Sequence, residues 1–309
     1  MNDILYDIQL KIRDKILFDY DMGNSTWFRA GGKAKGFIVI NNLEDVKTIV
    51  GFADKIKYTI IGVGSNLLVR DSGYDGLIIK LGKNFNRIKI KKNFLSVGAG
   101  VLDLNLAKFA LKNSIKDFEF FAGIPGTIGG AVIMNAGCYG AKTSDNLNRV
   151  LLLNANGEIK YKYLEELNLK YRSSTIGKNS IILQADFNFE YSSHEKILKK
   201  NKYVKSKRKE TQPIKEKTSG STFKNPKSGF AAELIEKAGC KGMKVGDASV
   251  SYMHSNFIIN NGTATASDIE NLAEKVKNRV KEVHGVELEW EIKILGEWIY
   301  ESFNFTRRL

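Results

Sequence analysis

Two glycine-rich stretches contain the residues of this chain that are best suited to binding a ligand. The first includes Gly62-Val63-Gly64-Ser65-Asn66, and the second runs from Gly123 through Gly126 and Gly130 to Gly137. Glycine lets a backbone approach a ligand closely and turn its N–H groups into a concave nest, which suits a diphosphate. The two stretches therefore predict loops that bind the phosphates of a nucleotide.

Neither stretch matches a common nucleotide-binding motif. After Gly62-x-Gly64, the position of the third Rossmann glycine is Leu67. Further along, Ala141 separates Gly140 from Lys142, so this run is not a Walker A loop. Two phosphate loops without either motif indicate a different nucleotide-binding fold.

Composition narrows the class of protein. The chain has 309 residues, of which 43% are hydrophobic, enough for two or three domains with cores of their own. No stretch approaches the ~18 uninterrupted apolar residues of a membrane span, and residues 1–4 do not begin a signal peptide. Cys138 and Cys240 have no metal-binding or redox spacing. We expect a cytoplasmic protein with free thiols, no metal site and no membrane partner.

The formal net charge of +14 favours an anionic partner. A solvated lysine-rich surface is the alternative for most of these residues, because they are spread along the whole chain. The densest run extends from Lys199 to Lys209. A nucleic-acid-binding protein would explain this run but leave both glycine loops unused, and the chain lacks aromatic residues interleaved with the basic ones. We therefore expect a small-molecule partner and no nucleic acid.

Apolar spacing predicts the elements that hold these loops. A helix with Asp103 near its start is expected at 102–111, a hairpin turns at Asn156-Gly157, and Ser267-x-x-Glu270 is a capping box for an amphipathic helix ending at Gly285. Other helices are expected at 43–56, 193–210 and 230–238. Strands are expected at 58–61, 67–69, 77–81, 88–90, 94–97, 150–153, 159–163, 181–189, 257–259 and 288–295.

Six motifs, taken in order, resemble the UDP-N-acetylenolpyruvoylglucosamine reductase (MurB) family. The resemblance runs from about residue 20 to about residue 297, and the short segment 173–180 resembles its type II branch. Any one motif is weak, but six in the right order are specific. The motifs are the two glycine loops, Ser25-Thr26-Trp27-Phe28-Arg29-Ala30-Gly31-Gly32, Lys170-Tyr171-Arg172-Ser173-Ser174, Gly220-Ser221-Thr222-Phe223-Lys224-Asn225-Pro226 and Glu291-Ile292-Lys293-Ile294-Leu295-Gly296.

The resemblance implies a mixed α+β fold of the vanillyl-alcohol-oxidase/PCMH type, which binds FAD between two subdomains and adds a C-terminal α+β substrate domain. In this chain the implied FAD-binding subdomains are residues 1–75 and 76–208, and the substrate domain is 209–291. The C-terminal segment 292–309 is expected to pack back on the FAD-binding part.

The resemblance also implies an activity. Non-covalent FAD accepts hydride from NADPH, and UDP-N-acetylglucosamine enolpyruvate then enters the same cleft and is reduced to UDP-N-acetylmuramate for peptidoglycan synthesis. A monomer is expected. The alternative is another FAD-dependent oxidase or dehydrogenase on the same fold, which would have no reason to combine Tyr171-Arg172-Ser173 with Gly220-Ser221 and Glu291.

Three catalytic residues are implied by the resemblance. Ser221 would protonate the substrate carbon, Arg172 would hold the substrate carboxylate, and Glu291 would lie beside the flavin. A neutral serine is a poor acid, and it serves here only if its acceptor is a strongly basic carbanion and positive charge stabilises the alkoxide. Without the resemblance, a structural role is the better interpretation of each residue: a turn or N-cap for Ser221, a surface position for Arg172 and a solvated sheet face for Glu291.

The remaining implied positions bind the cofactor or the substrate. The family often has arginine where this chain has Lys293, which cannot clamp a carboxylate with two parallel hydrogen bonds. The implied substrate-binding residues are Asn225, Arg208, Lys241, His254 and Lys293. The implied cofactor-binding residues are Gly62, Val63, Gly64, Ser65, Asn66, Leu67, Gly123, Ile124, Pro125, Gly126, Thr127, Gly129, Gly130, Ala131, Asn135 and Gly137.

Overall fold

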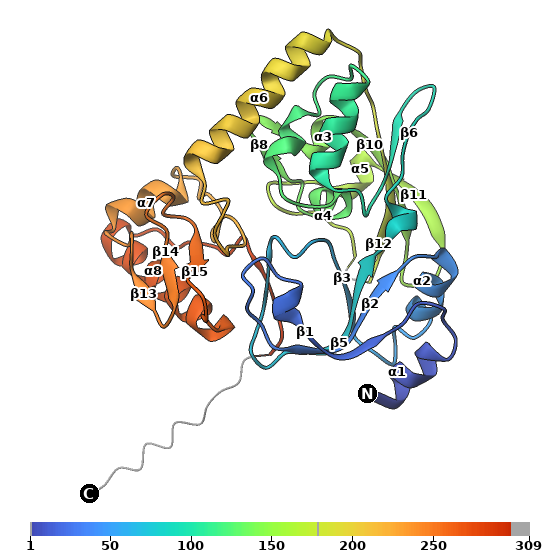
Figure 1. Ribbon diagram of the computed structural model, residues 1–309, viewed down its shortest axis with the longest axis horizontal. Coiled ribbons are helices and arrows are strands. Elements are labelled where there is room, and N and C mark those ends of the chain that lie inside the picture. The colour runs from blue at the N-terminus through green and yellow to red at the C-terminus, as the bar shows by residue number, and fades with distance from the viewer. Residues whose placement is uncertain (1, 178, 298–309) are drawn as a thin grey trace, which may run out of the picture.

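Two sheets with helices beside them form the larger part of the molecule, and a smaller helix-and-sheet unit from later in the chain lies next to them (Figure 1). This computed structural model describes residues 2–177 and 179–297. No helix within those ranges is both long and apolar enough to cross a membrane.

The first sheet has four strands in the order β1-β2-β5-β3. β1 (Leu17–Asp21) is antiparallel to β2 (Lys33–Ile40), whereas β5 (Tyr74–Leu81) lies parallel to both β2 and β3 (Tyr58–Ile61). Helices α1 (Asn2–Gln9) and α2 (Leu43–Val50) each bury one apolar face in the same core. The first glycine loop begins where β3 ends.

The second sheet is antiparallel and has the order β11-β10-β12-β7-β6. Helices α3, α4 and α6 lie on one side of it (Figure 1), and Phe118, Phe121 and Phe187 pack against one another in the core beneath them. The bounds are β6 (Ile88–Ile90), β7 (Leu95–Gly98), α3 (Asp103–Lys112), η3 (Glu119–Gly123), α4 (Ile128–Ile133), β10 (Leu147–Leu153), β11 (Ile159–Tyr163), α5 (Leu164–Leu167), β12 (Ile181–Phe187) and α6 (His194–Thr211).

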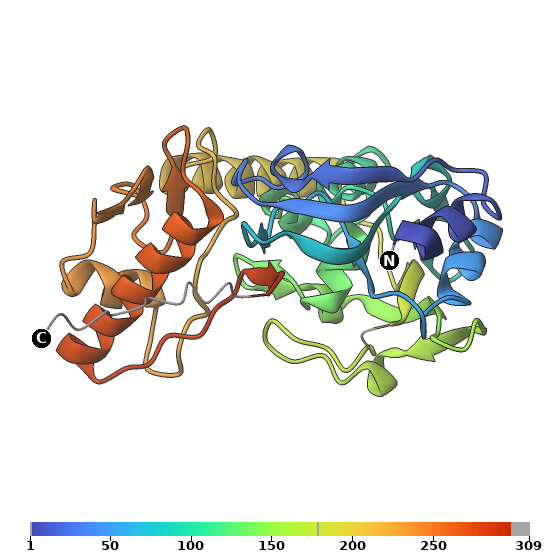
Figure 2. The same ribbon diagram turned by 90° about the horizontal axis from the view of Figure 1, so that it is seen from below.

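The third unit packs α8 (Ala266–His284) and α7 (Ala231–Lys237) with the sheet β13-β14-β15. Its strands are β13 (Lys244–Val245), β14 (Ala248–Val250) and β15 (Ile258–Asn260). Phe28 and Leu68, from the first part of the chain, complete its core. The chain then returns to the larger part (Figure 2), where β16 (Lys293–Leu295) pairs in parallel with β4 (Leu67–Val69).

Short elements account for the rest of the regular structure. They are η1 (Met22–Asn24), η2 (Lys83–Phe85), β8 (Gly137–Cys138), β9 (Ala141–Lys142) and η4 (Thr143–Asp145).

Three local predictions were wrong. Helix α8 starts earlier than expected, so its capping box is formed by Thr265 and Asp268 rather than by Ser267 and Glu270. The strand expected at 288–295 is regular only over 293–295, because the chain before it crosses between units and pairs singly with the segment at Phe223. A helix expected over 43–56 likewise ends at Val50.

The expected domain boundaries cut through regular elements. The boundary at 75/76 falls inside β5, which is hydrogen-bonded on both sides within the first sheet, and the boundary at 208/209 falls inside the last turn of α6. We propose boundaries after residues 81 and 211 instead. Of the segment 292–309, β16 lies on β4, and residues 298–309 lie outside the described residues.

A partly buried ion pair joins the third unit to the rest. Arg70 Nη2 lies 2.8 Å from Glu270 Oε1, and the glutamate side chain is only 4% exposed. The same guanidinium donates to the Gly296 carbonyl, 2.9 Å away. Next to it, the Asp71 carboxylate accepts hydrogen bonds from the backbone N–H groups of Ala266 and Ser267 at the start of α8. The position of α8 is therefore fixed by charged contacts at its N-terminal end.

Removing one partner of this pair should destabilise the protein strongly. Glu270→Ala removes the buried carboxylate that accepts hydrogen bonds from Arg70 Nε and Nη2, and breaking a buried pair costs about 3–5 kcal/mol. Glu282→Ala on the same helix is the control, because Glu282 is 66% exposed and pairs with Arg279 on the surface, where such pairs contribute ~0.2–1 kcal/mol. Urea denaturation of both variants measures the difference. Equal losses would show that the Arg70–Glu270 pair contributes no more than a surface pair.

Candidate active site

A cavity of about 1580 Å³ lies between the three units of the fold. Both glycine loops line it, together with residues 218–221 of the third unit and residues 291 and 293–295. Pockets for drug-sized ligands typically measure ~300–1,000 Å³. The cavity is therefore large enough for a dinucleotide and part of a second molecule.

The two glycine loops touch each other at the cavity wall. A Cβ placed on Gly62 would lie 2.6 Å from Thr127 Oγ1, and one on Gly64 would collide with the Ser25 carbonyl. Gly64 also has φ +70°, which favours glycine. These glycines are therefore required by packing inside the protein as well as by any ligand that approaches the loops.

Every implied cofactor residue lines the cavity except Asn135. The Asn135 side chain is buried; its Oδ1 accepts a hydrogen bond from the Ser144 N–H and its Nδ2 donates to the Lys170 carbonyl. Asn135 therefore connects the end of the second glycine loop to the segment that carries Arg172. A direct contact between Asn135 and the cofactor stays a prediction.

Arg172 and Glu291 meet across the cavity. Arg172 Nε lies 2.7 Å from Glu291 Oε1, and the two side chains are 20% and 13% exposed. Arg172 has φ +55° in a tight turn closed by hydrogen bonds between Lys170 and Ser173. Its Nη2 also donates to the Gly137 carbonyl, 3.3 Å away. The turn and these contacts hold the guanidinium at the end of the second glycine loop.

Burial raises the pKa of Glu291 above its usual value, and the charge of Arg172 only partly opposes this effect. Lys224 and Lys293 oppose it to a smaller extent. Desolvation disfavours the charged carboxylate, whereas a nearby cation favours it. Because the net shift is upward, Glu291 can hold a proton closer to neutral pH than an exposed glutamate can.

Ser221 lies on the same wall as Glu291. It follows Gly220, which has φ +81°, and it bridges to Phe257. The next residue, Thr222, accepts a hydrogen bond from the Glu291 backbone N–H at 2.9 Å. None of the described residues that line the cavity is a histidine, so the geometry offers no Ser-His pair for hydrolytic chemistry.

The implied substrate residues divide into two groups. Arg208 and Lys293 line the cavity, and Asn225, Lys241 and His254 are not among the described lining residues. The Arg208 Nε is buried with no hydrogen-bond partner among the described residues, and burial lowers the pKa of its guanidinium.

The three residues outside the lining have partners elsewhere. The Asn225 Oδ1 accepts a hydrogen bond from the Ala231 N–H at the start of α7, and the Lys241 ammonium lies 2.6 Å from Glu236. The His254 ring packs edge-on against Phe257, which does line the cavity. Their contacts with substrate stay predictions.

Sequence reasoning missed several residues of the cavity wall. It gives Asp103 only a position at a helix start, although this residue lines the cavity and is completely buried. Trp27 also belongs to the lining. The sequence did contain a signal for Asp103, which is an acid between Leu102 and Leu104. A charged group that is buried among apolar residues requires a partner.

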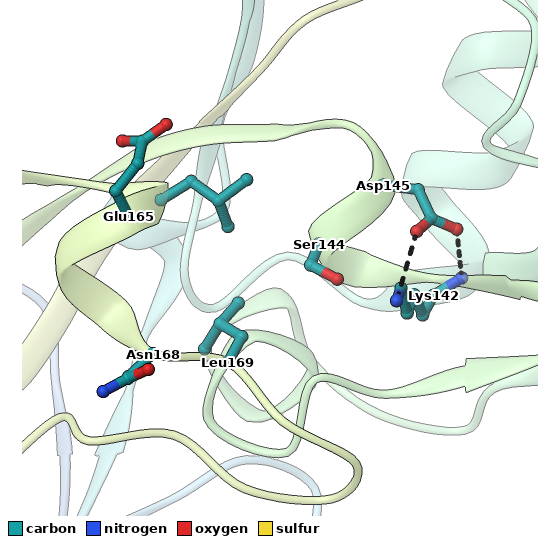
Figure 3. A pocket seen from close by; sticks show the side chains of 7 residues that line it. Lys142, Ser144, Asp145, Glu165, Asn168 and Leu169 are labelled. Atoms are coloured by element: carbon teal, nitrogen blue, oxygen red, sulfur yellow. Dashed lines mark hydrogen bonds and ion pairs between the residues drawn. The ribbon is translucent and has the colours of Figure 1, made fainter.

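A second hollow, of about 340 Å³, lies beside η4 and α5 (Figure 3). Two of its polar residues bind each other: the Lys142 ammonium lies 3.9 Å from Asp145 Oδ1, and the Lys142 backbone N–H donates to Asp145 Oδ2. It contains none of the implied site residues. The large cavity is therefore the candidate active site.

Comparison with known proteins agrees with this geometry. Residues 34–161 match the FAD binding domain family, and residues 212–295 match the family described as UDP-N-acetylenolpyruvoylglucosamine reductase, C-terminal domain. The reductase of Rickettsia conorii is 46% identical over 279 residues, which are 90% of this chain and 95% of the relative. That of Rickettsia prowazekii is 44% identical over 91% and 96% of the two chains.

Solved structures show the same relationship. The MurB reductase from Thermus caldophilus superposes with a TM-score of 0.80 at 33% identity, covering 92% of this chain and 99% of that one. A more distant likeness is Phl p 4.0202, a glucose dehydrogenase, with a TM-score of 0.50, 12% identity, and coverage of 62% and 44%. At that identity the likeness concerns the fold alone. The mixed α+β, FAD-binding fold expected from the sequence is confirmed.

The raised pKa of Glu291 predicts a pH effect on stability. Between the usual glutamate pKa and the raised one, the folded protein holds a proton that the unfolded chain has lost, so the contribution of Glu291 to stability falls as pH rises. Glu291→Gln should remove this fall, and the exposed Glu289→Gln is the control. Denaturant unfolding from about pH 4 to about pH 8 measures it. An unchanged slope in the Glu291→Gln variant would contradict the assignment.

Proposed function

This chain belongs to the UDP-N-acetylenolpyruvoylglucosamine reductase family, and on that basis we propose that it reduces UDP-N-acetylglucosamine enolpyruvate to UDP-N-acetylmuramate, with FAD as cofactor and NADPH as reductant. The reaction is a step of peptidoglycan precursor synthesis. One observation carries the assignment of the site: Arg172, Glu291 and Ser221 line one cavity together with both glycine loops.

The residues present fit FAD. Glycines of both loops, Gly62 and Gly126 among them, line the cavity without a side chain, so a ligand can lie directly against backbone there. When bound, FAD supplies the acceptor and donor of hydride. Burial raises the pKa of Cys138 to about 12, so this thiol stays protonated, and histidine is absent from the described lining. We therefore infer that the flavin is held without a covalent bond.

Arg172 is suited to hold the substrate carboxylate. A guanidinium has five N–H donors in a planar fork, and Arg172 directs Nε to Glu291 and Nη2 to the Gly137 carbonyl. Further donors of the same fork are left for a carboxylate. Hydrogen bonds between charged groups are about twice as strong as neutral ones, and they strengthen as negative charge moves onto the carboxylate during reduction.

Ser221 would deliver the final proton to the substrate carbon. The alkoxide that forms on its Oγ needs nearby positive charge, which Arg208 and Lys293 on the cavity wall can supply. Glu291, with its raised pKa, can act as a hydrogen-bond donor in its protonated form. The alternative is another FAD-dependent oxidase or dehydrogenase. Such an enzyme would not need this combination of serine, arginine and glutamate.

The finer parts of the proposal concern location and assembly. We infer a cytoplasmic monomer that acts on a small molecule and binds neither nucleic acid nor membrane. Two observations support this inference. The lysines are spread along the chain, and Arg172, Ser221 and Glu291 line one cavity. Part of the basic run is also structural, because Lys200 pairs with the buried Glu119, 3.4 Å away.

Replacing Ser221 tests the function directly. Ser221→Ala should leave reduction of the flavin by NADPH intact and slow oxidation by the sugar nucleotide, because only the second half-reaction needs the proton. General acid catalysis contributes about 10²–10⁴-fold. Stopped-flow absorbance at the flavin band separates the two steps, and the exposed Ser228→Ala is the control. If both half-reactions slow equally, Ser221 is a structural residue.

The basic residues of the cavity should act on substrate affinity. Arg208→Met removes a buried cation that faces the cavity, so KM for the sugar nucleotide should rise about ten- to hundred-fold with flavin content unchanged. Lys241 pairs with Glu236 and is not among the described lining residues, so Lys241→Met tests whether it contacts the substrate as the resemblance implies. Lys199→Met and Lys202→Met should stay within about twofold, because solvated charges are screened by salt. A large effect of these two surface variants would place the site elsewhere.

A further inference from the structure

Asn256, two residues before β15, binds the backbone of the segment that begins with Ser221. Its side-chain Oδ1 accepts a hydrogen bond from the Phe223 N–H at 3.0 Å, and its Nδ2 donates to the Phe223 carbonyl at 2.8 Å. The Asn256 carbonyl also accepts from the Thr222 N–H, 2.8 Å away. Asn256 therefore pairs with both residues that follow Ser221.

The side-chain amide of Asn256 pairs with Phe223 in the way that a neighbouring strand would. An amide carries a donor and an acceptor, whereas a carboxylate only accepts. Both amide groups bind the backbone of one residue, and Asn256 and Phe223 are only 3% and 1% exposed. Water cannot easily replace these two hydrogen bonds at such a buried position, so the segment depends on the amide for its place.

The chain that carries Glu291 holds the same segment. The Glu291 N–H donates to the Thr222 carbonyl at 2.9 Å, while the Thr222 N–H is the group that Asn256 binds. Thr222 is 0% exposed and thus lies between two backbones that both bind it. Because Ser221 directly precedes Thr222, these contacts set the position of Ser221 relative to Glu291.

The hydroxyl of Ser221 has no side-chain contact that would fix it independently. Its Oγ makes no hydrogen bond with any residue in the described part of the chain. The preceding Gly220 has φ +81°, a conformation that glycine adopts readily. The backbone from Ser221 onward, which bridges to Phe257 and is bound by Asn256, therefore decides where the hydroxyl lies in the cavity.

We propose that Asn256 is a positioning residue for the proton donor, whose side-chain amide holds segment 221–223 so that Ser221 Oγ faces the substrate carbon. The inference rests on the role proposed above for Ser221. Asn256 is not among the described lining residues, so it acts through the backbone of Phe223 rather than on the ligand. A misplacement of about 1 Å at a reacting group can cost about 10²-fold in rate.

A second buried asparagine of the same unit gives a matched control. Asn260 is also 3% exposed, and its Nδ2 donates to the Phe28 carbonyl while its Oδ1 accepts from the N–H groups of Gly262 and Ala264. None of these groups belongs to the segment that carries the proton donor. Loss of either amide should lower stability, whereas only loss of the Asn256 amide should slow proton transfer.

The test measures the two half-reactions in Asn256→Ala and Asn260→Ala, each corrected for flavin content. Stopped-flow absorbance follows reduction of the flavin by NADPH and its re-oxidation by saturating sugar nucleotide. Asn256→Ala should slow re-oxidation about ten- to hundred-fold and leave flavin reduction within about twofold of wild type. Asn260→Ala should leave both steps within about twofold. If Asn256→Ala does not fold, Asn256→Asp takes its place, because it keeps the size and the acceptor but, when ionised, lacks the donor.

A double variant asks whether Asn256 acts through Ser221. Adding Asn256→Ala to Ser221→Ala should slow re-oxidation no further, because the proton donor is already absent, whereas independent sites would multiply their losses. Multiplied losses would overturn the proposal. Equal slowing of both half-reactions in Asn256→Ala, unchanged re-oxidation in that variant, or the same slowing in Asn260→Ala would overturn it as well.

Failure of the proposed function looks different. The wild-type flavoprotein would then show no re-oxidation by the enolpyruvyl sugar nucleotide. Failure of the inference alone leaves wild-type activity intact and removes only the difference between the two asparagines.

Discussion

The parallel pairing of β16 with β4 is the contact on which the site depends. It sets the segment from Glu291 to Lys293 beside the first glycine loop, where the Asn66 side chain donates to the Glu291 carbonyl and the Lys293 N–H donates to the Asn66 carbonyl. The loop that is proposed to hold phosphates and the acid that faces Arg172 are thus fixed to each other through backbone. Without this return of the chain, the third unit would still be joined through the Arg70 and Asp71 contacts, the packing of Phe28 and Leu68 in its core and the chain leaving α6, but Glu291 would not be fixed beside the loop.

Charge near the cavity matters more than the large net charge of the chain. In the partly buried pair of Arg172 and Glu291, desolvation outweighs the neighbouring cation and the pKa of the acid rises. In water the same pair would interact weakly, because the effective dielectric constant is high. Most lysines lie on exposed surface, where salt screens them within about 8–10 Å. The substrate is therefore expected to sense a few cations rather than the total of +14.

Local patterns predicted the parts of the fold that depend on local chemistry. The two glycine loops, the strands around them and the αL glycine that ends α8 follow from residue type and spacing. The capping box at Ser267 failed because two overlapping cap patterns exist, and the Arg70 contact draws Glu270 into an ion pair instead. Ser221, Arg172 and Glu291 were indicated only by resemblance, since no local pattern shows that residues so far apart meet. Asp103 escaped notice because the absence of a partner is a tertiary property.

Backbone strain around the cavity explains why the site needs three units. Arg172 and Asn135 both have positive φ, at 55° and 40°, in conformations that L-residues seldom adopt. Such conformations cost of order 1–3 kcal/mol each and persist only when surrounding contacts over-determine them. Here those contacts run from Asn135 to Lys170, and from Arg172 to Gly137 and Glu291. Because Glu291 comes from the returning chain, docking of the third unit and orientation of the Arg172 side chain are coupled. A ligand that contacts all three units would stabilise this arrangement in proportion to its binding to the folded state alone.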